Sequence, residues 1–214
     1  MKQPANLILI AALTVVATTF AGAQTKLQPK AQPAPLQVPQ KWDREPEAVF
    51  GIKLGGLVSE LSLPLCPPKN RAGFYDTEPA NLCIFNSPYL PEKGADLYGT
   101  PELTVPYRAS LGYYKGVVSA IYLRLHQSNF EKLKAILMER YGPPTKVEVL
   151  EVTSGAGAKL TSQQIEWKGV KTNIMAIERV DTITQSYVAF SDVGTLEKKV
   201  FDLNSSTKGD AAKF

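Results

Sequence analysis

The chain of 214 residues carries 24 Lys and Arg against 20 Asp and Glu, which gives a net charge of +4. Four lysines in residues 1–41, where there is no acid, supply all of this excess, so the part from Trp42 onward is neutral. A nucleic-acid-binding domain concentrates Lys and Arg on its folded surface, and this composition therefore excludes a nucleic-acid partner. His126 is the only histidine, which excludes a metal site made of paired histidines.

Residues 1–23 have the three parts of a secretory signal peptide. Lys2 precedes an apolar stretch at 7–20, and the small residues Ala21-Gly22-Ala23 close the segment. The apolar stretch is shorter than the ~20 residues that cross a bilayer. We expect cleavage near Ala23/Gln24, a periplasmic or secreted protein, and no transmembrane segment after cleavage. An uncleaved N-terminal anchor is the alternative.

The segment after the predicted cleavage site, residues 24–46, is rich in Pro and Gln. Such a composition cannot bury enough apolar surface to offset the entropy of ordering the chain. We expect this segment to be an extended linker, followed by a single domain over 47–203 and a flexible tail over 204–214.

Cys66 and Cys83 are the only cysteines, and both follow the predicted cleavage site. In an exported protein an isolated pair of cysteines is typically oxidised. Their spacing is not that of a C-x-x-C redox or metal motif, so the pattern predicts a structural disulfide, with two free thiols as the alternative.

The first predicted elements of the domain are short. A strand is expected at 49–52 and a single helical turn at 57–61. Prolines and glycines make residues 88–106 loop-like over most of their length.

Alternation of apolar and polar residues predicts a β-hairpin in the centre of the chain, with strands at 103–111 and 117–125 and a turn at 114–116. The second strand should bury the apolar side chains Ile121, Leu123 and Leu125. Its opposite face should carry Tyr122, Arg124 and His126.

A helix follows the hairpin. Ser128 and Glu131 have the spacing of a capping box, in which each side chain satisfies a backbone N–H of the first turn. Gly142 and the prolines after it mark the C-terminus. The predicted buried face consists of Phe130, Leu133, Leu137 and Tyr141.

Four β-rich segments separated by turn residues come next, at 146–152, 164–167, 172–180 and 186–190. A small closing helix is expected at 195–203. The order of elements predicts an α+β fold, in which one antiparallel sheet, made of the hairpin and a C-terminal meander, carries one main helix packed on a face.

The pattern predicts no catalytic site, cofactor or metal centre. His126 lies at a strand end without the positioned nucleophile and orienting group that a catalytic base needs. Asp76 and Glu78 are close in sequence, as in a glycosidase pair, but a Pro-rich loop favours two solvated charges.

The aromatic residues carry the clearest functional signal. Several fall in loops and at the hairpin tip, where they are hard to assign to the core: Phe74, Tyr75, Tyr89, Tyr98, Tyr113 and Tyr114. A tyrosine can pack its ring and hydrogen-bond through its hydroxyl, which suits a recognition surface. We expect a binding surface formed by Tyr75, Tyr89, Tyr113 and Tyr114 and extended by Tyr122 and Arg124. The alternative is that these rings cover the irregular loops.

Several motifs occur in a recognisable order: Phe50-Gly51-Ile52-x-Leu54-Gly55, then Cys66, a hairpin, and L-x-x-x-L-x-x-R-Y-G-P-P at 133–144 ahead of a tryptophan strand. This order resembles small exported proteins of Gram-negative bacteria, a group of uncharacterised role. The resemblance covers most of residues 49–191 and implies a periplasmic setting, and it carries over no active site.

Together these features predict a non-enzymatic exported module that binds a protein or a cell-envelope component. A small hydrolase or transferase built from dispersed carboxylates and His126 is one alternative. An inhibitor of a wall-degrading enzyme is another.

Overall fold

The computed structural model describes residues 42, 44–70, 73, 75–85, 94–180 and 182–211, with the backbone alone for 208–211. All of them belong to one compact unit. The predicted signal peptide, most of the predicted linker, Phe74 and Tyr89 lie outside the described residues.

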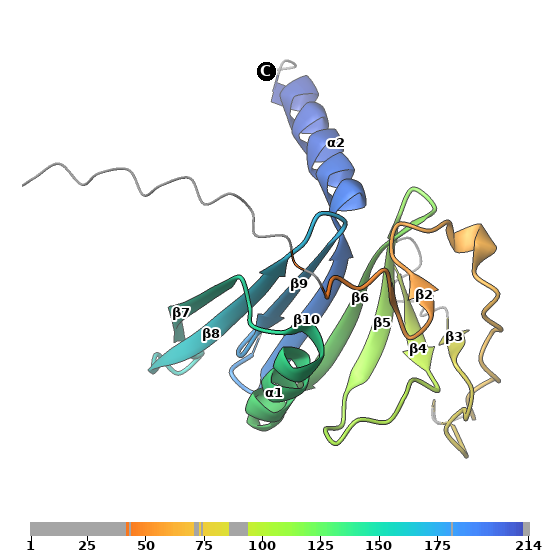
Figure 1. Cartoon of the computed structure of the whole chain (residues 1–214), viewed down its shortest axis with the longest axis horizontal. Helices are drawn as coiled ribbons and strands as arrows, with labels where there is room; N and C mark the ends of the chain where they lie inside the picture. Colours follow the sequence, from red (N-terminus) through yellow and green to blue (C-terminus); the bar gives the residue numbers. More distant parts are fainter. Residues whose placement is uncertain are drawn as a thin grey trace, which may run out of the picture. The chain divides into compact units, whose positions relative to one another are not determined.

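Eight antiparallel strands form the main sheet in the order β3-β4-β5-β6-β10-β9-β8-β7 (Figure 1). The strands are β3 (Cys83–Phe85), β4 (Gly94–Tyr98), β5 (Arg108–Tyr114), β6 (Val117–His126), β7 (Lys146–Thr153), β8 (Lys159–Lys168), β9 (Thr172–Ile177) and β10 (Gln185–Asp192). The hairpin β5–β6 and the meander β7–β10 confirm the predicted α+β fold with an antiparallel sheet.

The second strand of the central hairpin has the predicted buried and exposed faces. Ile121, Leu123 and Leu125 are buried, whereas Arg124 on the opposite face is exposed. The turn between the strands is made by Lys115 and Gly116, both with positive φ, as a two-residue hairpin turn requires.

Two predictions about this part of the sheet were wrong, one on the start of the first hairpin strand and one on the segment before it. The first hairpin strand begins at Arg108, not at 103, because Pro106 has no N–H to donate to the ladder. Residues 94–98, expected to be loop-like, form β4, which pairs with β5 through residues 94–97 and 109–112. Gly94 is required there, because a Cβ atom would lie 2.4 Å from the carbonyl oxygen of Leu111.

The predicted strand at 49–52 is instead a minimal hairpin, β1 (Ala48–Val49) with β2 (Ile52–Lys53). Phe50 and Gly51 at its turn both have positive φ, so the chain reverses where a straight strand was expected. Val49 and Ile52 are buried in the core. The helical turn predicted at 57–61 is confirmed as the 3₁₀ helix η1 (Val58–Glu60).

The main helix α1 (Phe130–Tyr141) packs on one face of the sheet, and all four residues predicted for its buried face are buried. Gly142 has a φ of 79° and donates its N–H to Met138 O at 2.8 Å, which ends the helix as predicted. We call the sheet face that packs against α1 the inner face and the opposite one the outer face.

The capping box predicted for α1 is not formed. Ser128 lies inside a 3₁₀ turn, η2 (Gln127–Asn129), that precedes the helix. His126, in an extended conformation, caps η2, because its Nδ1 accepts the N–H of Ser128 at 3.3 Å. The N-cap residue of α1 itself is Asn129, whose side chain makes no capping hydrogen bond.

The closing helix is longer than expected. α2 (Val193–Ala211) starts where Asp192 accepts the N–H of Thr195 at 2.7 Å, and it continues beyond residue 203 into the predicted tail. Asp202 on this helix accepts hydrogen bonds from Tyr114 at 2.9 Å and Lys115 at 2.7 Å, which joins α2 to the tip of the β5–β6 hairpin.

Among the described residues, contacts with the body are already made at Trp42, before the end of the predicted linker. The Trp42 indole donates to the carbonyl oxygen of Tyr141 at 2.8 Å. The Glu45 carboxylate accepts the backbone N–H groups of residues 170–172, at the turn between β8 and β9, at 2.5–3.2 Å. We call the described residues of this N-terminal segment, residues 42 and 44–46, the strap.

Candidate functional site

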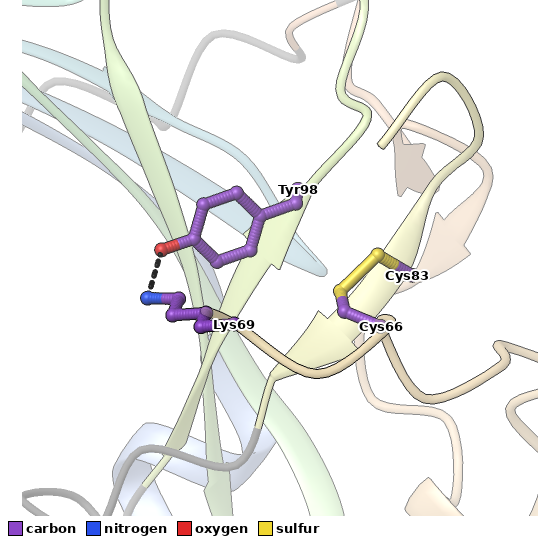
Figure 2. Close-up of a disulfide and its surroundings, with 4 residues drawn as sticks. All are labelled: Cys66, Lys69, Cys83 and Tyr98. Carbon is purple, nitrogen blue, oxygen red and sulfur yellow. Dashed lines mark hydrogen bonds between the residues drawn. A yellow bond between two sulfur atoms is a disulfide. The ribbon is translucent and has the colours of Figure 1, made fainter. Parts of the chain in front are cut away.

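The predicted disulfide is formed, and it joins the chain after η1 to edge strand β3. The two sulfur atoms of Cys66 and Cys83 are 2.02 Å apart (Figure 2). The same two segments also share backbone contacts, since Cys66 N–H donates to Ile84 O at 2.9 Å. This double attachment fixes where the loop that follows Cys66 leaves the sheet.

Lys69, three residues after the disulfide, lies among aromatic rings on the outer face. Its ammonium group donates to the Tyr98 hydroxyl at 3.0 Å (Figure 2). The same Nζ lies 4.2 Å from the ring centroid of Phe85, 5.0 Å from that of Tyr98 and 5.3 Å from that of Tyr75. These distances are those of cation–π interactions. We call these four residues the lysine–aromatic cluster.

Tyr75 completes the cluster but leaves one hydrogen bond unmade. Its ring meets Tyr98 edge to face, with centroids 4.8 Å apart. Its hydroxyl oxygen is buried and has no hydrogen-bond partner among the described residues. An unsatisfied buried polar group of this kind costs about 1–3 kcal/mol, so a ligand that supplied a partner would recover this energy.

The protonation states of the cluster favour hydrogen-bond donation. The ammonium group of Lys69 is charged and the hydroxyl of Tyr75 is protonated at neutral pH, as is usual for these side chains. The hydrogen bond to Tyr98 raises the pKa of Lys69, and burial raises the pKa of Tyr75, so both shifts act in the same direction. Both groups can therefore act as donors.

A cleft of about 680 Å³ opens beside the cluster. Its walls carry charges of both signs. The cations are Lys69 and Arg108, and the acids are Glu78, Asp96 and Glu102. Tyr75, Tyr98 and Tyr107 add ring surface. The volume lies within the range of small-molecule and side-chain binding pockets, and the polar lining suits a polar or charged ligand.

The cleft is continuous with a row of side chains across the outer face. Arg108 on β5 lies directly opposite Arg124 on β6, which in turn lies opposite Tyr187 on β10. Continuing the β4–β5 register by one residue places Tyr98 beside Arg108, and both line the cleft. We call Tyr98, Arg108, Arg124 and Tyr187 the Tyr–Arg row.

The structure divides the predicted binding surface. Tyr75 lies in the cleft, and Tyr122 and Arg124 lie on the outer face, where the Tyr122 ring stacks on Tyr187 with centroids 5.5 Å apart. Tyr113 and Tyr114 lie at the other end of β5, about 17 Å and about 20 Å from Arg108 at 3.4 Å per residue. The Tyr114 hydroxyl is bound to Asp202. Tyr89 lies outside the described residues, so its place in the predicted surface stays a prediction.

Sequence reasoning did not single out Lys69, Phe85, Arg108 or Tyr187 for this site. Lys69 belongs to an irregular loop, where no periodicity assigns a direction to a side chain. Arg108 does occupy an outer position of the hairpin alternation, so its place on the face could have been found. Its pairing with Arg124 could not, because that depends on the hairpin register.

The groups considered for catalysis are not brought together. His126 Nδ1 lies 2.8 Å from Ser128 Oγ in an exposed turn, where it caps η2. Asp76 lies in the loop after the disulfide and accepts a hydrogen bond from Asn70 at 2.9 Å. Over the part of the chain that the structure describes, no group of three or more His, Cys, Asp or Glu could hold a metal ion.

Comparison with known protein families, curated proteins and solved structures found no match to this chain. None of the helices in the described ranges is long and apolar enough to cross a membrane. The geometry of the cleft and of the Tyr–Arg row is therefore what bears on function.

Proposed function

We propose that the protein is an exported binding module that recognises a protein or a cell-envelope component through the cleft beside the disulfide. The signal-like residues 1–23 and the oxidised cysteine pair support an extracytoplasmic setting. The disulfide and the cation–π contacts of Lys69 hold the cleft wall in place before a ligand arrives, which lowers the entropy cost of binding.

One observation carries this proposal: the buried hydroxyl of Tyr75, which has no hydrogen-bond partner among the described residues and belongs to a cleft of ligand size. In a purely structural cluster, phenylalanine at this position would avoid the cost of burying the hydroxyl. A tyrosine there is accounted for by a ligand that accepts its hydrogen bond.

The test compares Tyr75→Phe with Tyr107→Phe. Both variants lose one hydroxyl from the same cleft, but the Tyr107 hydroxyl already donates to Pro101 O at 2.5 Å. We expect Tyr75→Phe to keep or raise the free energy of unfolding and to weaken binding. Tyr107→Phe should lower the free energy of unfolding by about 1 kcal/mol and leave binding unchanged.

Binding is measured by capture from a periplasmic and envelope extract on the tagged protein recovered from the periplasm after export. Components that the wild type and Tyr107→Phe retain, and Tyr75→Phe retains less, support the proposal. If all three capture the same components in the same amounts, the cleft is not the recognition site.

A further inference from the structure

The cleft beside the disulfide is lined by three carboxylates and two cations. The carboxylates of Glu78, Asp96 and Glu102 form no salt bridge with any residue in the described ranges. Asp96 is half-buried on β4, and a partly buried charge gains more from a counter-ion than an exposed one does. A cationic group of a ligand would find this compensation in the cleft.

Another part of the cleft wall is arranged to donate hydrogen bonds. The buried Tyr75 hydroxyl has no hydrogen-bond partner among the described residues. The ammonium group of Lys69 has three N–H donors, and one of them is used by the Tyr98 hydroxyl at 3.0 Å (Figure 2). Such donors bind carboxylate oxygens, most strongly where the donor is itself charged. This part of the wall therefore fits an anionic group of a ligand.

The donors and the carboxylates lie close together. Lys69 Nζ is 5.3 Å from the centroid of the Tyr75 ring. Burial and, to a smaller extent, the nearby charges of Glu78 and Asp96 raise the pKa of Tyr75, so both carboxylates lie within electrostatic range of its hydroxyl. A ligand that satisfies both parts of the wall must carry its opposite charges a short distance apart, as an amino acid or a short peptide does.

Three tyrosine rings give the cleft apolar surface beside these charged groups, and the surrounding structure holds them in place. The Tyr107 ring stacks on Phe50 with centroids 6.1 Å apart, and its hydroxyl donates to Pro101 O. Tyr75 meets Tyr98 edge to face. Rings that are fixed before a ligand arrives add contact area at a low entropy cost. The side chain of a ligand can pack against them.

We propose that the cleft binds a zwitterionic ligand, an amino acid or a short peptide with a free ammonium group and a free carboxylate group. The ligand carboxylate accepts hydrogen bonds from Tyr75 and Lys69, and the ligand ammonium group pairs with Asp96 and Glu78. This proposal rests on the proposed function, and it names the ligand class of that site.

The experiment titrates the purified exported protein with L-phenylalanine and with L-alanyl-L-phenylalanine by isothermal titration calorimetry. Each ligand is compared with its N-acetyl form, which lacks the ammonium charge, and with its amide, which lacks the carboxylate charge. We expect the zwitterion to bind about tenfold or more tightly than either form, because each form loses hydrogen bonds between charged groups.

Asp96→Asn tests the contact with the ammonium group. It should weaken binding of the zwitterion about tenfold and leave binding of the N-acetyl form unchanged, since that form has no positive charge to pair with residue 96. Glu139→Gln is the matched control. Glu139 is an exposed carboxylate on α1, which does not line the cleft, so its replacement should change no affinity. Urea denaturation of both variants verifies that they are folded.

The comparison of the two zwitterions identifies the source of the charged groups. The dipeptide carries its charges one peptide unit farther apart than the amino acid does. Tighter binding of the dipeptide supports the proposal with a peptide as the source. Equal or tighter binding of L-phenylalanine supports it with a free amino acid as the source.

The proposal is overturned if neither zwitterion binds, if removing either charge leaves the affinity unchanged, or if Asp96→Asn weakens the N-acetyl form as much as the zwitterion. In that case a component captured in a Tyr75-dependent manner would leave the proposed function standing. Zwitterion binding with no Tyr75-dependent capture would instead uphold the ligand class and contradict recognition of a protein or envelope component by the cleft.

Discussion

Reducing the Cys66–Cys83 disulfide should lower the free energy of unfolding by about 3 kcal/mol. The two cysteines are 17 residues apart, and closing a loop of this length removes about 10 cal/mol/K of entropy from the unfolded chain in the loop-closure description. At 25 °C this corresponds to about 3 kcal/mol. With a urea m value of about 2 kcal/mol/M, the midpoint of unfolding should fall by about 1.5 M.

The measurement compares urea denaturation of the oxidised and the reduced wild type, followed by tryptophan fluorescence. Trp167 is fully buried under α1, so its emission reports the unfolding of the sheet core. The Cys66→Ala/Cys83→Ala variant serves as the control, because its midpoint should match the reduced protein and should not respond to reductant.

An unchanged midpoint on reduction would refute this reasoning. It would mean that the loop between the cysteines unfolds independently of the sheet, so that its closure entropy does not contribute to the main transition. The contacts of Lys69 with three rings across the loop and the sheet argue for a shared transition.

Three further outcomes follow from the sequence and the structure. Gly99→Ala should lower the free energy of unfolding by about 2 kcal/mol or more in the same urea assay, because φ is +64° and the added Cβ would lie 2.1 Å from backbone. Hydrogen bonds from Lys115 and Tyr114 lower the pKa of Asp202. The tie of α2 to the hairpin should therefore persist above the ordinary carboxyl pKa of about 3.9 and be lost as the pH falls through the lower value of the folded state. Amide exchange of α2 should show this loss on acidification, and Asp202→Asn should abolish the pH dependence. If the signal peptide is cleaved as expected, mass spectrometry of the exported protein will give a chain that begins at Gln24, whereas an intact Met1 would contradict it.

Regular elements with strong local signals were predictable from the sequence. The inner face of α1 follows from the spacing of its apolar residues, and Gly142 ends the helix because only glycine adopts its backbone angles at low cost. The β5–β6 hairpin follows from alternation and a two-residue turn. In both cases the residues that determine the element lie within one continuous stretch of the sequence.

Elements formed by pairing with distant residues were not predictable in this way. β4 contains glycine and aspartate, which disfavour strands, and it forms because β5 offers a partner for residues 94–97. Ser128 does not cap α1, because the chain enters this helix through the 3₁₀ turn η2 and Ser128 lies inside that turn without the extended backbone of an N-cap residue.

The candidate site shows the same limit. Tyr75, Tyr122 and Arg124 could be selected for their residue type and loop or outer-face position. That Tyr75 and Arg124 belong to one continuous surface, through Tyr98 and Arg108, depends on the register between three strands. Tyr114 lies at the other end of β5, away from that surface, and its hydroxyl donates to Asp202 on α2.

The strap determines how a mechanical load would enter the protein. A force applied to the strap would act on the body through the Trp42 indole and the Glu45 carboxylate, which attach to the end of α1 and to the β8–β9 turn. In the strand order, β6 and β10 stand between these attachment points and the strands that carry the cleft. A pull on the strap would therefore act on one side of the sheet, away from the strands that carry the cleft.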